Sequence, residues 1–393
     1  MLSSFKLGIL TLINNALNGT KNPLPEDFNY SKLYNFAVRH QIMSLIYYGG
    51  AYNPEFISND VDGNLRYSTL YTTVAGEKQF YEAEKVFAAF EENGIDYMKL
   101  KGVKLRNLYP RSEMRVMGDA DILIREEQMG KIENIMQSLG YTHIITSDHE
   151  WIWGKGEYQI ELHKKLIPSY VKDFYSYFGS GWDFAKKVAP ESFEHEMSPE
   201  NEFIYLLAHF AKHYGCSGIG IKHTVDLYLF LKKHSSLDFA YINAQFETLG
   251  LLKFYENIKR MLDVWFENAE CDEISEFLTN RIFKNGAYGN QTASVVSQAA
   301  MLAKGKNAKV AKFKKLIKIV FPKYEHMCPS YPWIKGKPIL LPVAWVYRAF
   351  KVLLFKREKI ATCNSDMKAI NKTNIDSYRA ELDMVGLNFD FEV

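Results

Sequence analysis

Two carboxylates, Asp119 and Asp121, stand one residue apart immediately before an apolar run that ends at Ile124. The run is typical of a β-strand, in which residues i and i+2 point to the same face. Both carboxylates are therefore expected on one face, close enough to share a divalent cation. Two like charges held so close are unfavourable unless a cation lies between them. The pair thus indicates metal-dependent chemistry on phosphates.

A third carboxylate, Glu161, lies in the middle of a second predicted strand at 158–163. If this strand neighbours the first, Glu161 faces the same site while Ile160 and Leu162 face the core. Three carboxylates around two Mg²⁺ or Mn²⁺ ions form an arrangement suited to in-line displacement at phosphorus. For an isolated Asp-x-Asp pair, solvated turn residues are the alternative interpretation.

Cationic residues lie upstream of the aspartates. Lys101 and Gly102 form a turn between a predicted strand at 95–100 and a short helix. A glycine in such a turn lets backbone N–H groups approach phosphate oxygens, and a lysine adds positive charge. In the next loop, Arg111 and Arg115 are candidates to bind a triphosphate. A simple turn glycine and solvated arginines are the alternatives.

The sequence patterns around these residues predict an α+β fold, in which a small mixed β-sheet is flanked by N-terminal and C-terminal helical regions. Alternating apolar residues predict strands, and a 3.6-residue apolar period with a cap predicts helices. We expect strands at 95–100, 119–124, 141–146, 150–153 and 158–163, and a helix at 126–139. From about residue 170 onward the pattern is helical. The expected parts are 1–94 (helical), 95–168 (α/β core), 169–300 (helical) and 301–393 (basic and apolar helical extension).

Composition indicates an ordinary soluble protein. The 393 residues carry a net charge of only +2, so no global field demands a nucleic-acid partner, although one remains possible. The most membrane-like stretch, 337–355, is interrupted by Pro342, Arg348 and Lys351, so no transmembrane segment is expected and an interfacial helix is the alternative. Four scattered cysteines without CxxC spacing are typical of reduced thiols. We therefore expect a cytoplasmic protein.

Two further patterns have a chemical and a plain interpretation. His209 and His213 lie four residues apart on one predicted helix, a spacing that can bind zinc, but no third ligand is evident. A structural or substrate-facing pair is the alternative. Lysines crowd the segment 304–323 at helical spacing with apolar residues. Such a helix suits RNA, an anionic lipid surface or an acidic acceptor, and a solvated face is the alternative.

Several strings together resemble a known family. Met98–Pro110 reads MKLKGVKLRNLYP, Arg115–Ile124 reads RVMGDADILI, and Ile160–His163 reads IELH. With the spaced histidines, Lys222 and Asp226-Leu227 of the helical half, they resemble the uncharacterised nucleotidyltransferase family of the polymerase-β-like superfamily, over about residues 30–260. The chain departs from the wider superfamily in having Gly102-Val103 where Gly-Ser or Gly-Gly is usual, and in having Glu161 where Asp is frequent.

The resemblance implies transfer of a nucleoside monophosphate from an NTP to an unidentified acceptor with release of pyrophosphate and with Mg²⁺ or Mn²⁺ as cofactor. The acceptor is a small molecule, a protein or RNA, and a small molecule is favoured. It also implies Asp119, Asp121 and Glu161 as catalytic metal ligands, with Lys101 and Gly102 near the phosphates. We further expect Gly118, Arg111 and Arg115 near the nucleotide, and His163, His209, His213, Lys222 and Asp226 on the acceptor side. A catalytically inactive nucleotide- or partner-binding module and, less favoured, an Asp-x-Asp glycosyltransferase are the alternatives.

Overall fold

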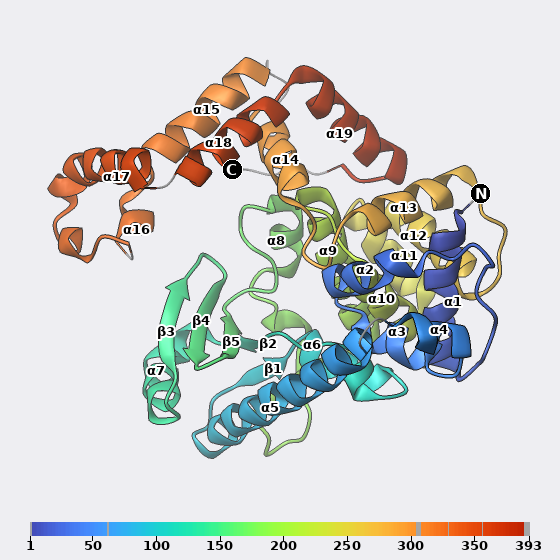
Figure 1. The fold of residues 1–393 in the computed structure, drawn as a ribbon. Coiled ribbons are helices and arrows are strands. Elements are labelled where there is room, and N and C mark those ends of the chain that lie inside the picture. Colours follow the sequence, from blue (N-terminus) through green and yellow to red (C-terminus); the bar gives the residue numbers. More distant parts are fainter. Residues whose placement is uncertain (1, 61–62, 304–307, 329, 356, 389–393) are drawn as a thin grey trace. The chain divides into compact units, whose positions relative to one another are not determined.

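The computed structural model describes residues 2–60, 63–303, 308–328, 330–355 and 357–388. These residues divide into two compact units. The first comprises residues 2–214, 218–289 and 385–388, and the second comprises the remainder of the described chain, 215–217 and 290–384. The α+β fold expected from the sequence is confirmed, since the first unit combines a mixed sheet with many helices (Figure 1). The four-part division of the chain stays a prediction.

A seven-stranded sheet forms the centre of the first unit, in the order β3-β4-β5-β2-β1-β7-β6. Its strands are β1 (Tyr97–Lys99), β2 (Ala120–Ile124), β3 (Thr142–Thr146), β4 (Glu150–Lys155), β5 (Tyr158–His163), β6 (Ala185–Lys187) and β7 (Glu194–Met197). β2 runs parallel to β5 and β1 parallel to β7, while the other neighbours are antiparallel. All five strands expected between residues 95 and 163 are present.

The two faces of the sheet differ in chemistry because successive residues alternate between them. One face is apolar and carries Ile122, Ile160 and Leu162, which are fully buried against helices α5 (Asn64–Glu92) and α7 (Met129–Ser138). Figure 1 shows α5 lying along this part of the sheet. The residues in between, Asp121 and Glu161, point to the opposite face. Burial of the apolar face therefore fixes where these carboxylates project.

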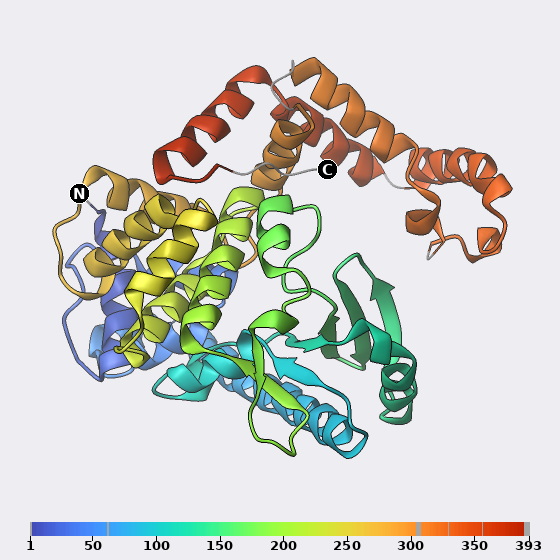
Figure 2. The same cartoon turned by 180° about the vertical axis from the view of Figure 1, so that it is seen from behind.

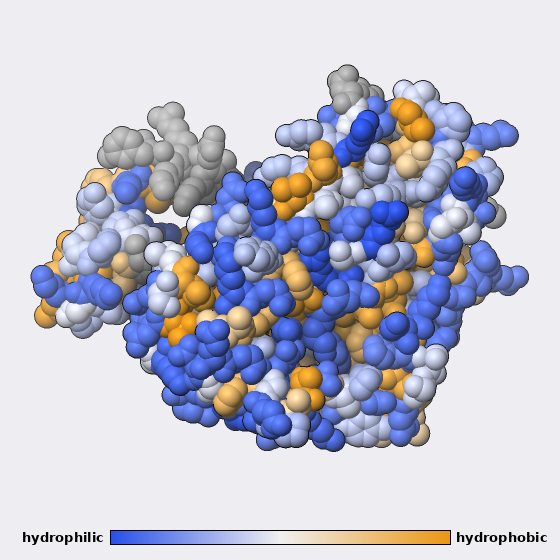
Figure 3. Space-filling model, turned by 90° about the horizontal axis from the view of Figure 1, so that it is seen from below, coloured by the Kyte–Doolittle hydropathy of each residue, from blue (hydrophilic) through white to orange (hydrophobic). Residues whose placement is uncertain are grey.

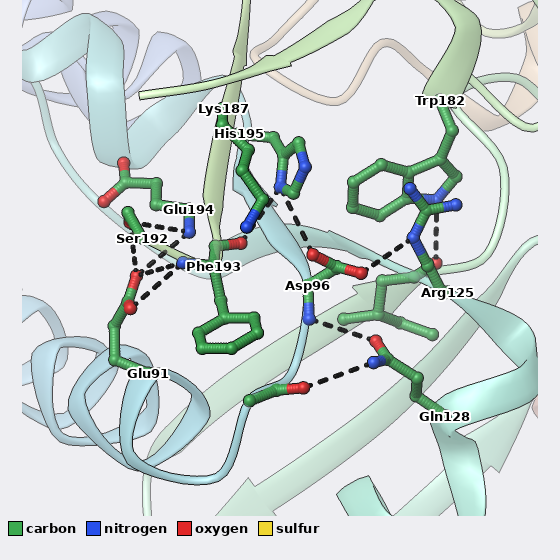
Figure 4. Close-up of polar contacts among 12 residues, drawn as sticks. Glu91, Asp96, Arg125, Gln128, Trp182, Lys187, Ser192, Phe193, Glu194 and His195 are labelled. Atoms are coloured by element: carbon green, nitrogen blue, oxygen red, sulfur yellow. Dashed lines mark hydrogen bonds and ion pairs between the residues drawn. The ribbon is translucent and has the colours of Figure 1, made fainter. Parts of the chain in front are cut away.

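The interpretation of everything after residue 170 as helical is wrong for β6 and β7. Both strands are short, and their sequences, AKK and EHEM, lack an alternating apolar pattern. Polar contacts hold β7 beside β1 instead (Figure 4). The Glu91 carboxylate, at the end of α5, accepts hydrogen bonds from the backbone N–H groups of Phe193 and Glu194. A carboxylate from a distant helix is not readable from the local pattern of a strand.

A second set of polar contacts in Figure 4 secures the start of β1. Arg125 donates from Nε to Asp96 Oδ2 at 3.0 Å and stacks over the ring of Trp182. The Asp96 backbone N–H donates to Gln128 Oε1. These contacts connect β1 to the segments that follow β2 and precede β6.

The remaining helices of the first unit are α1 (Ser4–Asn18), α2 (Leu33–His40), α3 (Met43–Gly50), α4 (Pro54–Asn59), α6 (Gly102–Leu105), α8 (Lys172–Phe178), α9 (Pro199–Cys216), α10 (Ile221–Lys233), α11 (Phe239–Thr248), α12 (Leu252–Phe266) and α13 (Glu273–Lys284), with α9 ending just beyond the unit boundary. Of these helices, α9 and α10 contribute side chains to the cavity above the second face of the sheet, and several others lie to one side of the sheet (Figure 1). The N-terminal helices lie beside α12 and α13 in both views (Figures 1 and 2). Arg39, for example, donates to the Phe283 carbonyl oxygen.

The second unit is helical where it is described. It contains α14 (Gln291–Ala303), α15 (Ala308–Val320), α16 (Tyr324–Met327), α17 (Leu341–Phe355), α18 (Arg357–Ala369) and α19 (Lys372–Val385), the last residue of which belongs to the first unit. The lysine-rich segment expected to form a basic helix corresponds to α15, although Lys304 and Lys306 lie outside the described residues. Apolar side chains such as Phe313 and Leu316 are exposed between its lysines.

The lengths of the helices and the polarity of the surface show whether a segment could cross a membrane. Within the residues that the structure describes, every helix is too short or too polar to cross a bilayer. Hydrophilic residues dominate the face seen in Figure 3, and apolar residues appear there in separate groups.

Candidate active site

Three adjacent strands deliver polar side chains to one face of the sheet. In the parallel pair β2–β5, Asp121 lies opposite Glu161. In the antiparallel pair β4–β5, Glu150 lies opposite His163. Because opposite residues on neighbouring strands share a face, the four side chains meet above the sheet. The expected meeting of Asp121 and Glu161 required that their strands be neighbours, and β2 and β5 are neighbours.

Asp121 is the most tightly held of these groups. Its Oδ1 accepts hydrogen bonds from Lys101 Nζ and from His163 Nε2, each at 2.8 Å. The side chain is 7% exposed. Burial alone would raise the pKa of this carboxyl, but the Lys101 ammonium and the His163 hydrogen bond outweigh it and lower the pKa below its usual range. Asp121 is thus a fixed anion.

Asp119 and Glu161 are less well compensated. Burial and the neighbouring Asp121 carboxylate raise the pKa of Asp119. Burial, followed by the charges of Asp121 and Asp119, raises the pKa of Glu161 to about 8. The carboxylate charge exceeds what the local protein cations neutralise, which is the condition that a bound cation relieves.

The donor set suits such a cation. Ligand atoms of Asp121, Glu161 and His163 all lie within 4.8 Å of one another. Asp119 is outside this group of three, although its charge is close enough to affect the Glu161 carboxyl. Carboxylate oxygens are the ligands that Mg²⁺ and Mn²⁺ prefer. The residues on β2 and β5 therefore fit a divalent metal ion.

The turn after β1 is strained. Lys101 has φ +39°, a region that L residues rarely adopt, and it directly precedes α6. This backbone directs the Lys101 side chain to Asp121. The glycine that follows leaves room for an arginine, because a Cβ on Gly102 would lie 3.0 Å from Arg115 Nη1. Strain of this kind persists only where surrounding contacts enforce it.

Arg115 is committed to a partner within the protein. Its Nε and Nη2 donate to the two carboxylate oxygens of Asp226, at 2.7 and 2.9 Å, and Tyr109 Oη donates to Asp226 Oδ1 at 2.8 Å. Arg115 and Asp226 are 7% and 3% exposed. The pair connects the loop before β2 to α10, so two residues that the sequence analysis assigned to different substrates contact each other.

The first loop arginine lies elsewhere. The Arg111 side chain is 61% exposed, and its guanidinium lies over the ring of Tyr48 at 5.2 Å. Arg111 is not among the residues that line the cavity described below.

Helices α9 and α10 supply the remaining polar wall. Nε2 of His213 and Nε2 of His209 are 3.1 Å apart, so one ring must donate and the other accept. Burial, with the positive charges of Lys101 and Lys212 nearby, lowers the pKa of both imidazoles well below the usual value. The histidine pair is therefore neutral and suited to hydrogen bonding with a substrate.

Lys222 lies on α10, and its side chain contacts Gln41, the residue that follows α2. Its Nζ donates to Gln41 Oε1 at 2.5 Å and lies 5.8 Å from the centroid of the Tyr288 ring. Burial and the nearby Arg115 lower its pKa to about 8. Gln41 follows α2 in a left-handed conformation, with φ +54°, so the helix end aims this amide at Lys222.

These groups enclose a cavity of about 330 Å³. Every predicted site residue except Arg111 lines it: Lys101, Gly102, Arg115, Gly118, Asp119, Asp121, Glu161, His163, His209, His213, Lys222 and Asp226. Sequence reasoning missed His149, Glu150 and Tyr288, which also line it. Glu150 reaches the site through the pairing of β4 with β5, and Tyr288 reaches it through tertiary packing, so neither has a local sequence signal.

The structure of the antibiotic-resistance factor ANT(2'')-Ia matches with a TM-score of 0.33 and 15% sequence identity, over 44% of this chain and 93% of that chain. A search of curated proteins gave no significant match.

The sequence match to a protein family is more extensive. Residues 26–267, which include both strands that carry the carboxylates and the α9–α10 wall, match the family described as uncharacterised nucleotidyltransferase. The match spans more than half of the chain and contains every residue of the cavity lining except Ala287 and Tyr288. The chain therefore belongs to the uncharacterised nucleotidyltransferase family, and it is a transferase.

Proposed function

We propose that the cavity above β2 and β5 catalyses metal-dependent transfer of a nucleoside monophosphate from an NTP to an acceptor hydroxyl. The observation that carries the proposal is the register of Asp121 opposite Glu161 on neighbouring parallel strands, with Asp119 two residues before Asp121. Family membership supports nucleotide transfer as the reaction class.

In this proposal Asp119, Asp121 and Glu161 hold Mg²⁺ or Mn²⁺. When bound, a divalent cation neutralises phosphate charge and lowers the pKa of an acceptor hydroxyl. The acceptor oxygen attacks the α-phosphorus, the bond from that phosphorus to the pyrophosphate oxygen breaks, and pyrophosphate leaves. Glu161 takes the proton of the acceptor hydroxyl.

The chain's own cations have separate roles. Lys101 holds Asp121 ionised and oriented through the 2.8 Å hydrogen bond, and so acts on the metal site through that carboxylate. Lys222 lines the cavity and adds positive charge for a polyphosphate. Arg115 is a positioning residue, because two of its nitrogens are occupied by Asp226. Arg111, lying outside the cavity lining, is not assigned a role.

A small-molecule acceptor is favoured by the size of the cavity. Its volume of about 330 Å³ lies at the lower end of the range for small-molecule sites. The neutral His209–His213 pair and Gly118, whose missing side chain leaves space beside the Tyr288 hydroxyl, line the same cavity. These residues would bind the acceptor through hydrogen bonds.

The test uses purified protein, each α-labelled NTP in turn, Mg²⁺ or Mn²⁺, and a cell extract as the source of acceptor. Asp119→Asn and Asp121→Asn are compared with Asp96→Asn, a matched control whose carboxylate pairs with Arg125 away from the cavity lining. Label transfer by wild type and the control alone supports the proposal. Transfer that persists in both site variants, or nucleotide binding without transfer in every extract fraction, contradicts it and favours a binding module.

A further inference from the structure

A second group of metal-ligating side chains adjoins the carboxylates on β2 and β5. His149, Glu150 and His163 offer two ring nitrogens and a carboxylate oxygen, all within 4.8 Å of one another. His149 immediately precedes β4, Glu150 begins it, and Glu150 lies opposite His163 in the β4–β5 pair. The register of β4 and β5 thus places Glu150 beside His163, which also contacts Asp121 on the neighbouring strand.

One ring nitrogen of each histidine already contacts a polar side chain, as is common for histidines that bind a metal ion. His163 Nε2 lies 2.8 Å from Asp121 Oδ1, and His149 Nδ1 lies 3.2 Å from Ser147 Oγ. In metal sites the ligating histidine commonly uses its other ring nitrogen to contact a carboxylate or another polar group, which fixes the ring. The other nitrogen of His149, Nε2, lies 3.0 Å from Glu150 Oε2. The ring that contacts Ser147 therefore presents its second nitrogen to the carboxylate.

His163 carries an independent sign of a ligand. The side chain is 3% exposed, and its Nδ1 has no hydrogen-bond partner among the described residues. If Nε2 donates its proton to the Asp121 carboxylate, Nδ1 is an unprotonated nitrogen with a lone pair. A buried lone pair without a partner is unusual in native proteins, because its desolvation is not compensated. A bound cation would compensate it.

The type of ligand selects the type of metal. Two imidazoles and one glutamate form a donor set that binds Zn²⁺ in catalytic sites, where a fourth position stays open to water or substrate. Mg²⁺ prefers oxygen donors and suits the carboxylates of β2 and β5 better. His149, Glu150 and His163 all line the cavity, so an open fourth position would face the space that substrates occupy.

We propose that His149, Glu150 and His163 bind one divalent transition-metal ion of the Zn²⁺ class, at a site distinct from the Asp119–Asp121–Glu161 centre. The proposal goes beyond nucleotide transfer and does not depend on it. The ion would stand beside the cavity and present its open position to a phosphate or acceptor oxygen.

Equilibrium dialysis of the full chain, free of any histidine tag, against Zn²⁺ in millimolar Mg²⁺ tests the site. Wild type is expected to bind one Zn²⁺ that excess Mg²⁺ does not displace. His149→Gln and Glu150→Gln are expected to weaken Zn²⁺ binding at least tenfold. His143→Gln, on exposed β3, is the matched control and should bind as wild type does. Circular dichroism establishes that each variant is folded.

Ser147→Ala covers the case in which a ligand variant fails to fold. It removes the hydroxyl beside His149 Nδ1 without removing a ligand, and about a tenfold loss of Zn²⁺ affinity is expected. Wild type that binds no Zn²⁺ in excess Mg²⁺, or binding that is unchanged in both His149→Gln and Glu150→Gln, overturns the proposal. Asp119→Asn should keep its Zn²⁺ even though it is expected to lose transfer, so failure of one proposal is distinguishable from failure of the other.

Discussion

The buried Arg115–Asp226 pair should be among the most sensitive contacts of the first unit. Asp226→Leu leaves the Arg115 guanidinium buried without a carboxylate and leaves Tyr109 Oη without its acceptor. Removing one partner of a buried ion pair costs about 3–5 kcal/mol. Arg115→Met should cost a similar amount, because the Asp226 carboxylate then loses both of its guanidinium hydrogen bonds and retains the Tyr109 hydrogen bond and a His223 nitrogen 3.8 Å away.

The double variant separates the pair from its surroundings. With both charges replaced by apolar side chains, no buried charge remains from the pair, so the total cost should fall short of the sum of the single costs by about 2 kcal/mol. Urea unfolding followed by circular dichroism gives the three differences in the free energy of unfolding. Single-variant costs that add to within about 0.5 kcal/mol would refute the reasoning, since residues in direct contact should couple. Asp226→Asn, which keeps the shape and loses the charge, should fall between wild type and Asp226→Leu.

Three other predictions concern single residues. Burial lowers the pKa of His40 to about 3, so the unfolded chain binds a proton at this histidine before the folded chain does as the pH falls below 6.5. Wild type should therefore lose about 2 kcal/mol more stability than His40→Gln between pH 7 and pH 5, measured by urea unfolding, and an equal loss in both proteins would contradict this. Lys101→Gly and Lys101→Met remove the same charge, but only glycine adopts the positive φ of this position without strain. The glycine variant should therefore be more stable than the methionine variant by about 1 kcal/mol in thermal unfolding, and the reverse order would exclude strain at this turn. Gly102→Ala should destabilise the protein by about 1 kcal/mol because the added Cβ crowds Arg115, whereas Gly130→Ala should stabilise it slightly because the Cβ meets open space within α7. Equal effects of the two variants in urea unfolding would show that the Arg115 side chain moves aside without cost.

The elements around the carboxylates could be predicted because their local patterns are strong. The run from Ala120 to Ile124 is fully buried, and Gly140 and Gly156 adopt the positive φ that ends a helix or turns a hairpin. By contrast, β6 and β7 have charged sequences and exist through contacts with Glu91 and β1. Short strands stabilised by distant partners leave no periodic signal.

The candidate site was predictable in its residue types more than in its contacts. Asp121 and Glu161 could be placed on one face, but their neighbouring position depends on which strands pair, and that is a tertiary property. Arg115 reads as a loop cation, yet its partner Asp226 lies 111 residues further along the chain. No local pattern encodes a contact over that separation. Glu150, by its place opposite His163, belongs to the site for the same tertiary reason.

Parallel reactions with α-labelled and γ-labelled NTP test the central claim most directly. The protein, an acceptor-containing extract fraction and Mg²⁺ are common to both reactions, and Asp121→Asn is run beside wild type. Nucleotidyl transfer predicts acceptor label from the α-labelled NTP alone, pyrophosphate release in equal amount, and a rate at least about a hundredfold lower in the variant, since the metal centre contributes several kcal/mol. Label that reaches the acceptor from the γ position, or an α-label rate unchanged in Asp121→Asn, would contradict a nucleotidyltransferase centre on β2 and β5.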